Sequence, residues 1–138
     1  QKRRRRMNNH KLLIHFPSRI LSGNSTAHWR RKAEVKKIEQ LKTLEAIGKH
    51  GSFYLPDALY IVQRILFFPP DKRKRDDDNF MIALKAARDT IFAQSDEHDD
   101  SQIRLTIIEW GEVCKGGAVG LEFSPLVEYE KERVKDWE

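Results

Sequence analysis

The chain has one cysteine, few glycines and no long apolar run, and each of these features excludes a class of protein or site. Its 138 residues include a single cysteine, Cys114, so no disulfide can form within the chain, which is typical of proteins of the reducing cytoplasm. No apolar run approaches the ~20 residues of a membrane span, and no signal-peptide core follows the basic N-terminus. The seven glycines form neither a phosphate-binding loop nor a dinucleotide fingerprint. We therefore expect a cytoplasmic protein with no membrane partner and no nucleotide cofactor.

The composition combines a small hydrophobic content with much charge. Hydrophobic residues make up 39% of the chain and charged residues 34%, which fits one domain with a modest core. A small core with so much charged surface often accompanies an oligomer or a polyanionic partner. The five histidines are scattered and only His98 lies near acidic residues, so a zinc site is not expected.

The charge is distributed unevenly along the chain. Residues 1–75 carry 19 Lys and Arg against 5 Asp and Glu, a net charge of +14, whereas residues 76–138 carry 7 against 16, a net charge of −9. This asymmetry indicates a nucleic-acid binder whose acidic half serves a purpose other than binding phosphate directly. Residues 1–6, which precede Met7, are either an arm that touches phosphate or residues from an upstream start.

Two segments have helical patterns. Asn24 or Ser25 can cap a long helix that runs to about residue 47, where Gly48 and Gly51 stop it. A second helix is expected over about residues 79–93, with Asp78 as its N-cap. Apolar residues recur on one face of each helix, which predicts the buried side. These residues are Trp29, Ala33, Leu41, Leu44 and Ile47 in the first helix, with Ile38 at the margin, and Phe80, Leu84, Ala87 and Ile91 in the second.

Four segments have strand patterns. Residues 11–16 and 59–68 are dense in β-branched, aromatic and other apolar residues, and each ends at proline. Residues 102–112 alternate, with Ile103, Leu105 and Ile107 on one face. Residues 118–123 follow a glycine turn and are expected to pair back on residues 102–112 as a hairpin.

The order of these elements, β-α-β-α-β-β, predicts the fold class. We expect an α/β protein, a small mixed sheet covered by two helices. Residues 1–9 are expected to be a basic, disordered arm, residues 10–125 a single domain and residues 126–138 a charged tail, helical but frayed from about residue 127.

Two acidic clusters flank the second helix. Asp76, Asp77 and Asp78 follow the basic run 72–75, and residues 96–100 contain a second cluster that ends in Asp99 and Asp100. Like charges packed this tightly repel one another unless a cation offsets them, and carboxylate oxygens are the ligands that Mg²⁺ prefers. A loop that returns toward the sheet could bring the two clusters together. The alternative is a pair of solvated, Asp-rich turns, and Asp77, Asp96 and Glu97 fit that alternative best.

Lys85 lies on the helical line of Asp78. It is seven residues after Asp78 and four before Asp89, so all three fall within about 20° of one line. A lysine on the same face as metal carboxylates could hold a scissile phosphate or stabilise charge on the leaving oxygen. The alternative is a surface salt bridge with Asp89 worth ~0.3–0.5 kcal/mol.

These residues carry a resemblance to a known family. The run Asp76-Asp77-Asp78-Asn79, the pair Lys85 and Asp89, and the run from Asp99 to Gln102 resemble the D-x-D-N, Lys-to-Asp and D-D-x-Q signatures of RusA-type crossover-junction endodeoxyribonucleases. The run from Asn24 to Arg30 is similar to the entry into that family's first helix. The resemblance covers roughly residues 10–123.

The resemblance implies a fold, an activity and a site. It implies a cytoplasmic, RusA-like homodimer, of a kind frequent in phages and prophages, that resolves Holliday junctions in DNA recombination and repair by Mg²⁺-dependent hydrolysis, with Mn²⁺ as a possible substitute. The implied metal ligands are Asp76, Asp78 and Asp100, with Asp99 beside them. Members of the family often place the catalytic lysine four residues after the second Asp, where this chain has Ile82, so Lys85 would be a longer-reach equivalent or a structural residue.

Binding to branched DNA is expected from two basic groups. Each neutralised phosphate steepens the dependence of affinity on salt. The candidate residues are Arg30, Arg31, Lys32, Lys36 and Lys37 on the first helix and Lys72, Arg73, Lys74 and Arg75 in the connection. Many of the helical residues could instead be ordinary solvated surface. Trp29 is expected to anchor the core rather than to stack on a base. A non-catalytic DNA-binding module and a less specific metal-dependent nuclease remain alternatives.

Overall fold

The computed structural model describes residues 9–127 and 131–138, which form a four-stranded sheet and two long helices. The elements follow one another as β1 (Lys11–Ile14), η1 (Arg19–Leu21), α2 (Trp29–His50), β2 (Ile61–Phe68), α3 (Asp77–Ala93), η2 (Asp100–Gln102), β3 (Ile103–Trp110), β4 (Ala118–Pro125) and η3 (Val134–Trp137). This confirms the predicted order of strands and long helices. The arm at residues 1–8 lies outside the described residues, and so do residues 128–130 of the tail.

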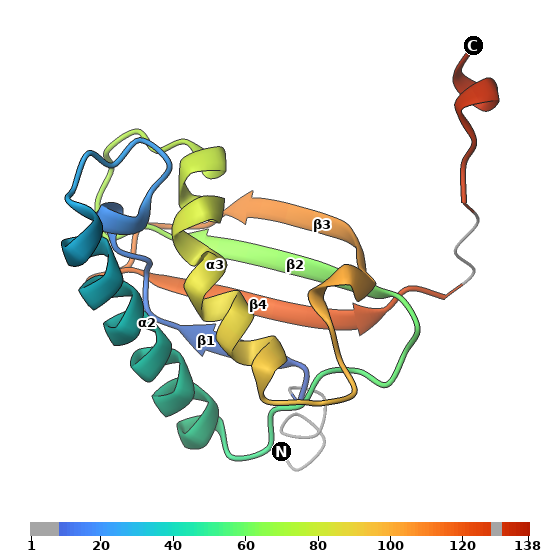
Figure 1. Ribbon diagram of the computed structural model, residues 1–138, viewed down its shortest axis with the longest axis horizontal. Coiled ribbons are helices and arrows are strands. Elements are labelled where there is room, and N and C mark those ends of the chain that lie inside the picture. The colour runs from blue at the N-terminus through green and yellow to red at the C-terminus, as the bar shows by residue number, and fades with distance from the viewer. Residues whose placement is uncertain (1–8, 128–130) are drawn as a thin grey trace.

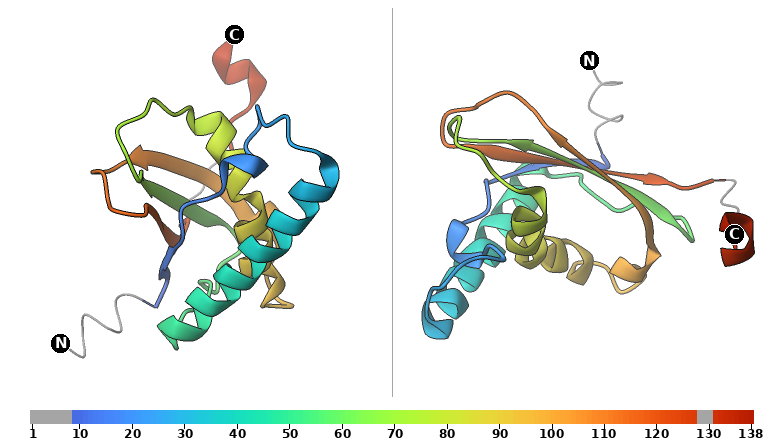
Figure 2. Two further views of the ribbon diagram at one scale, coloured as in Figure 1. Left: turned by 90° about the vertical axis from the view of Figure 1, so that its left-hand side faces the viewer. Right: turned by 90° about the horizontal axis from the view of Figure 1, so that it is seen from above.

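The sheet is mixed, and both long helices cover the same face of it. The strand order is β1-β4-β2-β3. β2 and β3 are parallel, whereas β4 is antiparallel to both β1 and β2. Seen from above, α2 and α3 lie on one side of the sheet, and no helix among the described residues covers the other side, called here the bare face (Figure 2). The predicted α/β class, a small mixed sheet covered by two helices, is therefore confirmed.

The predicted hairpin between β3 and β4 is wrong. β4 pairs with β2 and β1, so β2 separates β4 from β3 (Figure 1). The chain leaves β3 and crosses the end of β2, where the Gly111 N–H donates to Phe67 O at 2.8 Å and the Cys114 N–H donates to Pro69 O at 2.9 Å. Gly116 and Gly117, with φ of 81° and 71°, then turn the chain. Positive φ at two successive residues strongly favours glycine, so the glycine turn was recognised correctly but its partner strand was not.

The core lies between α3 and the inner face of β1, β4 and β2. Ile61, Ile65 and Phe67 on alternate positions of β2 are fully buried, as expected for one face of a pleated strand. The predicted stripe of α3 is confirmed, because Phe80, Leu84, Ala87 and Ile91 are all buried and belong to the same hydrophobic cluster.

The predicted buried face of α2 is wrong except at Ile47, which is partly buried and packs against the core. The buried residues of this helix are Val35, Glu39 and Thr43, while Trp29 is 67% and Leu41 66% exposed. The caps also differ from the prediction: His28 is the N-cap, and the helix continues through Gly48 to end at Gly51, whose φ is 81°.

The bare face of the sheet mixes apolar and charged side chains. Leu105 and Ile107 of β3 are partly exposed there. Arg64 on β2 pairs with Glu109 at 2.6 Å and with Glu122 at 3.8 Å. Ion pairs this exposed contribute little to stability. Within residues 9–127 and 131–138, no helix has the length and apolar character needed to cross a membrane.

Candidate nucleic-acid and metal site

The first acidic cluster forms the N-terminus of α3. Asp76 is the N-cap, and its Oδ1 accepts a hydrogen bond from the Asp78 N–H at 2.9 Å. The predicted N-cap, Asp78, is therefore wrong, and Asp76 caps the helix instead. Asp77 and Asp78 lie in the first turn and are exposed, where the positive end of the helix dipole favours negative charge. Asp76 and Asp78 are thus two exposed acidic residues joined at the cap of one helix.

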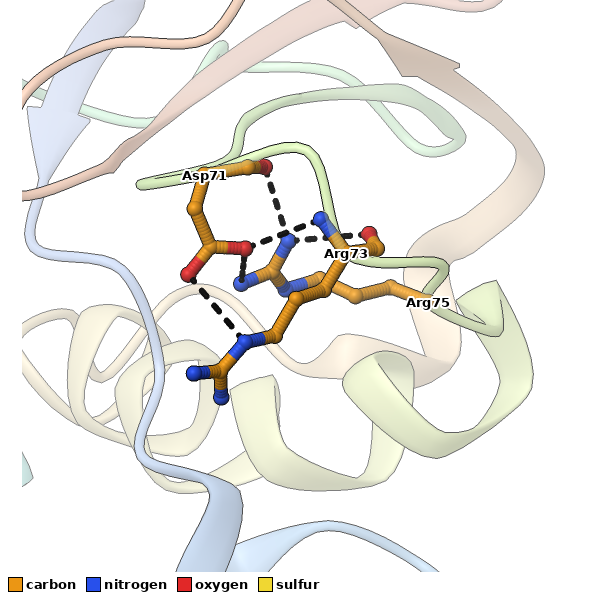
Figure 3. A network of polar contacts seen from close by, with 3 residues as sticks. All are labelled: Asp71, Arg73 and Arg75. Atoms are coloured by element: carbon orange, nitrogen blue, oxygen red, sulfur yellow. Dashed lines mark hydrogen bonds and ion pairs between the residues drawn. The ribbon is translucent and has the colours of Figure 1, made fainter.

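The basic connection before α3 is held by Asp71. Arg75 donates to Asp71 O at 3.0 Å, to Asp71 Oδ1 at 2.8 Å and to Arg73 O at 3.1 Å (Figure 3). Its guanidinium also lies 5.5 Å from the centre of the Phe16 ring, and its side chain is only 8% exposed. The Arg73 N–H, together with Arg75, holds the pKa of Asp71 below its usual value. Arg75 therefore shapes the connection, whereas Lys72, Arg73 and Lys74 are exposed, although the Arg73 Nε also lies 3.8 Å from Asp71 Oδ2.

A polar cavity joins this connection to the loop before α2. The cavity has a volume of about 410 Å³. It is lined by Arg19, Ser22, Asn24, Ser25, Thr26, Arg73, Lys74, Arg75, Asp76, Asn79 and Phe80. Two segments some fifty residues apart, each part of the family resemblance, therefore meet in space. Arg19 and Ser22 were not predicted, although a basic residue in a polar loop that follows a strand was a visible signal.

A close backbone approach fixes this meeting point. The Gly23 N–H donates to Asn79 O at 3.3 Å. A Cβ at Gly23 would lie 2.7 Å from Ile82 Cδ1 and 2.8 Å from Asn79 Oδ1, so a larger residue would require these two side chains of α3 to move. Ile82, at the position where the family pattern has lysine, thus lies against the loop.

Lys85 forms a surface salt bridge with Asp89, the alternative to a catalytic position. Its Nζ lies 2.9 Å from Asp89 Oδ2, and the two side chains are 67% and 40% exposed. This is a surface ion pair one helical turn apart, of the kind worth a few tenths of a kcal/mol. A role for Lys85 in catalysis stays a prediction.

The second acidic cluster is tied to its own loop. The Asp99 N–H donates to Gln102 Oε1 at 2.7 Å, and the Ser101 hydroxyl donates to Asp99 Oδ2 at 2.7 Å. This hydroxyl is the main reason why the pKa of Asp99 is held below its usual value. Gln102 in turn donates to Ala58 O at 2.9 Å. Asp99 and Gln102 therefore have a structural function, because they fix the entry into β3.

Within one chain, the predicted metal ligand Asp100 does not lie beside Asp76 and Asp78. Ile103 pairs with Ile61. Asp100, which precedes β3, therefore lies near the N-terminal end of β2. Asp76 follows the other end of β2, and eight strand residues span about 26 Å. Accordingly, the two acidic clusters lie at opposite ends of α3 (Figure 1). In the part of the chain that the structure describes, no group of three or more His, Cys, Asp or Glu is placed to hold a metal ion.

Arg88 marks the neighbourhood of Asp100. Burial lowers the pKa of the Arg88 guanidinium, and the carboxylates of Asp100 and Asp89 oppose that shift. Arg88 also donates to Gln63 Oε1 at 2.9 Å beneath the helix. It is ten residues after Asp78, about 15 Å along the helix axis, which agrees with the separation of the clusters.

The basic residues of α2 divide into two groups. Lys32 donates to Ser25 O at 3.1 Å and Arg31 lies 3.5 Å from Glu34, so these two have contacts within the chain. Arg30, Lys36 and Lys37 are exposed, and the Arg30 guanidinium also lies 5.3 Å from the centre of the Trp29 ring. Arg30 lies at the end of the helix that follows the cavity loop.

Comparison with known proteins adds no family. No family model matches the chain, and no curated protein matches it.

Proposed function

We propose that this protein is a Mg²⁺-dependent endonuclease that acts as a homodimer on branched DNA, with the four-way junction as its substrate. The observation that carries the proposal is the polar cavity, in which Arg73 and Lys74 lie beside Asp76 and the loop that contains Asn24. Cationic side chains suit a DNA backbone, and the adjacent carboxylates suit a hard divalent cation. Together with the motif resemblance, this pairing favours cleavage of a phosphodiester.

The donor set fits Mg²⁺. This ion is usually held by one or two carboxylates, with water and substrate phosphate completing its shell. Asp76 and Asp78 are neighbouring, exposed carboxylates, and they would hold the ion. When bound, the ion would supply Lewis-acid activation of the phosphate and of water.

The residues of the chain position the reaction. Arg73, Lys74 and the loop residues Asn24 and Ser25 bind the backbone on either side of the scissile phosphate. Water attacks the phosphorus, the bond from phosphorus to the 3′ oxygen breaks, and the departing oxygen takes up a proton. The products are a 5′ phosphate and a 3′ hydroxyl. Lys85 would offset transition-state charge only if it leaves Asp89.

A second chain would complete the site. Since Asp100 lies at the far end of α3 from Asp76 and Asp78, a third carboxylate near the ion would come from the partner copy in the proposed dimer. A twofold dimer would also present two matching active sites to the two scissile strands of a junction.

The test is cleavage of a synthetic four-way junction with Mg²⁺, with Mn²⁺ and with EDTA. Asp78→Asn is expected to reduce cleavage by about 100-fold or more, as for other losses of electrostatic stabilisation in an active site, and to leave junction binding intact. Asp77→Asn is the matched control, because Asp77 is in the same helical turn and outside the D-x-D pattern. If Asp78→Asn cleaves at the wild-type rate, the proposal is wrong.

Mixing two inactive variants tests the contribution of the second chain. In a heterodimer of Asp78→Asn with Asp100→Asn, a site built from two chains would exist once in wild-type form, and cleavage of one strand would return. A site built within one chain would be defective in both halves, and the mixture would stay inactive.

One specific observation favours a second candidate, a non-catalytic DNA-binding module. Asp76 caps α3 and Asp99 fixes the entry into β3, so both motifs have structural functions without a metal. This candidate predicts that the wild-type protein binds the junction and never cuts it, with or without Mg²⁺.

A further inference from the structure

Trp29 is placed where a core residue would not be. It is the first residue of α2 and its side chain is 67% exposed. Tryptophan is highly buried on average in folded proteins. The sequence had assigned it to the buried face, and the rotation of α2 that buries Val35, Glu39 and Thr43 instead leaves the indole at the surface.

The indole has two cationic or polar neighbours within the chain and remains largely exposed. The His28 ring lies 5.6 Å away at a tilt of 32°, and the Arg30 guanidinium lies 5.3 Å from the centre of the ring. His28 is itself fixed as the N-cap, since its Nδ1 accepts from the Arg30 N–H at 3.2 Å. The ring therefore stands on the first turn of a long helix rather than on a loop.

The ring follows the lining of the polar cavity closely along the chain. Thr26, which lines the cavity, is only three residues before Trp29, a span of at most about 11 Å. Lys32, one turn further along α2, donates to Ser25 O in the same lining. A backbone bound in the cavity would therefore pass its neighbouring nucleotide close to the indole.

We propose that Trp29 is a stacking platform for an unpaired nucleobase next to the bound phosphates. The inference rests on the proposed function only in that the ligand is DNA, and it does not require cleavage. The chemistry of the surroundings selects this ligand. Arg30, Arg73 and Lys74 attract phosphate, and a base presents the π-face that an exposed indole binds without regard to sequence. Branched DNA offers such unpaired or unstacked bases at its branch point.

The experiment compares two ligands and two variants in EDTA, where no cleavage occurs. The ligands are a labelled oligothymidine and an abasic strand of the same length, which keeps the phosphates and lacks the bases. The wild-type protein is expected to bind oligothymidine about 10-fold more tightly than the abasic strand, within the range known for stacking on aromatic residues. Trp29→Ala is expected to remove this preference and Trp29→Phe to restore most of it.

Two readouts separate stacking from other causes. Trp29→Ala is expected to keep the wild-type slope of log affinity against log salt, because no phosphate contact is lost. Trp137→Ala is the control, since Trp137 is 79% exposed in η3, far along the chain. A wild-type preference for bases that survives in Trp29→Ala overturns the proposal, and so does a wild-type protein that binds both strands equally.

The two proposals can fail independently. A protein that never cuts a junction but loses base preference in Trp29→Ala would disprove the enzyme and support the platform. A protein that cuts junctions while Trp29→Ala retains the preference would do the reverse.

Discussion

The two helices lie on the same face of the sheet, but α3 buries apolar side chains whereas α2 buries mainly polar ones. α3 lies over the centre of the sheet and buries an apolar stripe against β2. α2 lies beside β1 at the edge of the sheet (Figure 1) and buries Glu39 and Thr43 together with Val35, while Ile38, Leu41 and Leu44 are 45%, 66% and 41% exposed. Apolar periodicity therefore identified the buried side of one helix and the exposed side of the other.

Polar contacts explain the orientation of α2. The Ser18 N–H donates to Glu39 Oε1 at 2.7 Å, and His15 pairs with the other carboxylate oxygen. The Thr43 hydroxyl donates to Glu39 O at 2.8 Å. A buried carboxylate without such partners would cost several kcal/mol, so once Glu39 is anchored, the apolar stripe on the opposite side has to face outward.

The comparison is tested most strongly in α3. Leu84 is 1% exposed within the cluster, so Leu84→Ala is expected to lower the free energy of unfolding by about 2–5 kcal/mol, the range for cavity-forming substitutions of buried leucine. Urea unfolding followed by circular dichroism measures the change. A loss below about 1 kcal/mol would mean that α3 is not the main packing element.

The second test is the polar anchor of α2. Burial acts to raise the pKa of Glu39, but the hydrogen bonds with His15 and with the Ser18 N–H, and the charges of His15 and Lys42, hold it below its ordinary value of 4.5. A depressed pKa in the folded state means that the ionised carboxylate stabilises the fold above pH 4.5 and that this contribution is lost as the pH falls through the folded value.

Glu39→Gln is accordingly expected to cost about 1–3 kcal/mol at neutral pH, the cost of leaving a buried partner unsatisfied. Unfolding curves of wild type and variant measured from pH 7 down to pH 3 should converge on the acid side. Curves that stay parallel over this range would show that the charge of Glu39 is not what anchors α2.

The sequence was informative where the determining interactions are local. The stripe of α3, the end of β2 at Pro69 and the glycine turn before β4 all depend on neighbouring residues, and the structure contains each of them. β1 instead ends at Ile14, three residues before Pro17. The partner of β4 and the buried face of α2 depend on residues far apart in the chain. The pairing of Glu39 with His15, 24 positions away in the sequence, left no periodic signal.

The same division applies to the candidate site. Asp76 and Asp78 are close because they are nearly adjacent in the sequence. The approach of Asn24 to Asp76 across the cavity depends on the fold, and the sequence did not predict it. The separation of Asp100 from Asp76 and Asp78 follows from the parallel pairing of β2 with β3. In a parallel pair the start of β3 lies beside the start of β2, and so at the opposite end of the strands from the C-terminal end of β2. No local sequence pattern predicts that two strands pair in parallel.

The smallest effect is expected on the exposed stripe of α2. Leu41→Ala removes an apolar side chain that is 66% exposed, so the free energy of unfolding should change by less than about 0.5 kcal/mol. Leu84→Ala, the same substitution in the other helix, is the matched control. Thermal unfolding at several protein concentrations sharpens the test, because a stripe covered by a second copy would make the wild-type midpoint rise with concentration. If Leu41→Ala abolished such a dependence, the outward face of α2 would be an interface, and the two helices would then follow one rule: each buries its apolar stripe, one against its own sheet and the other against another chain.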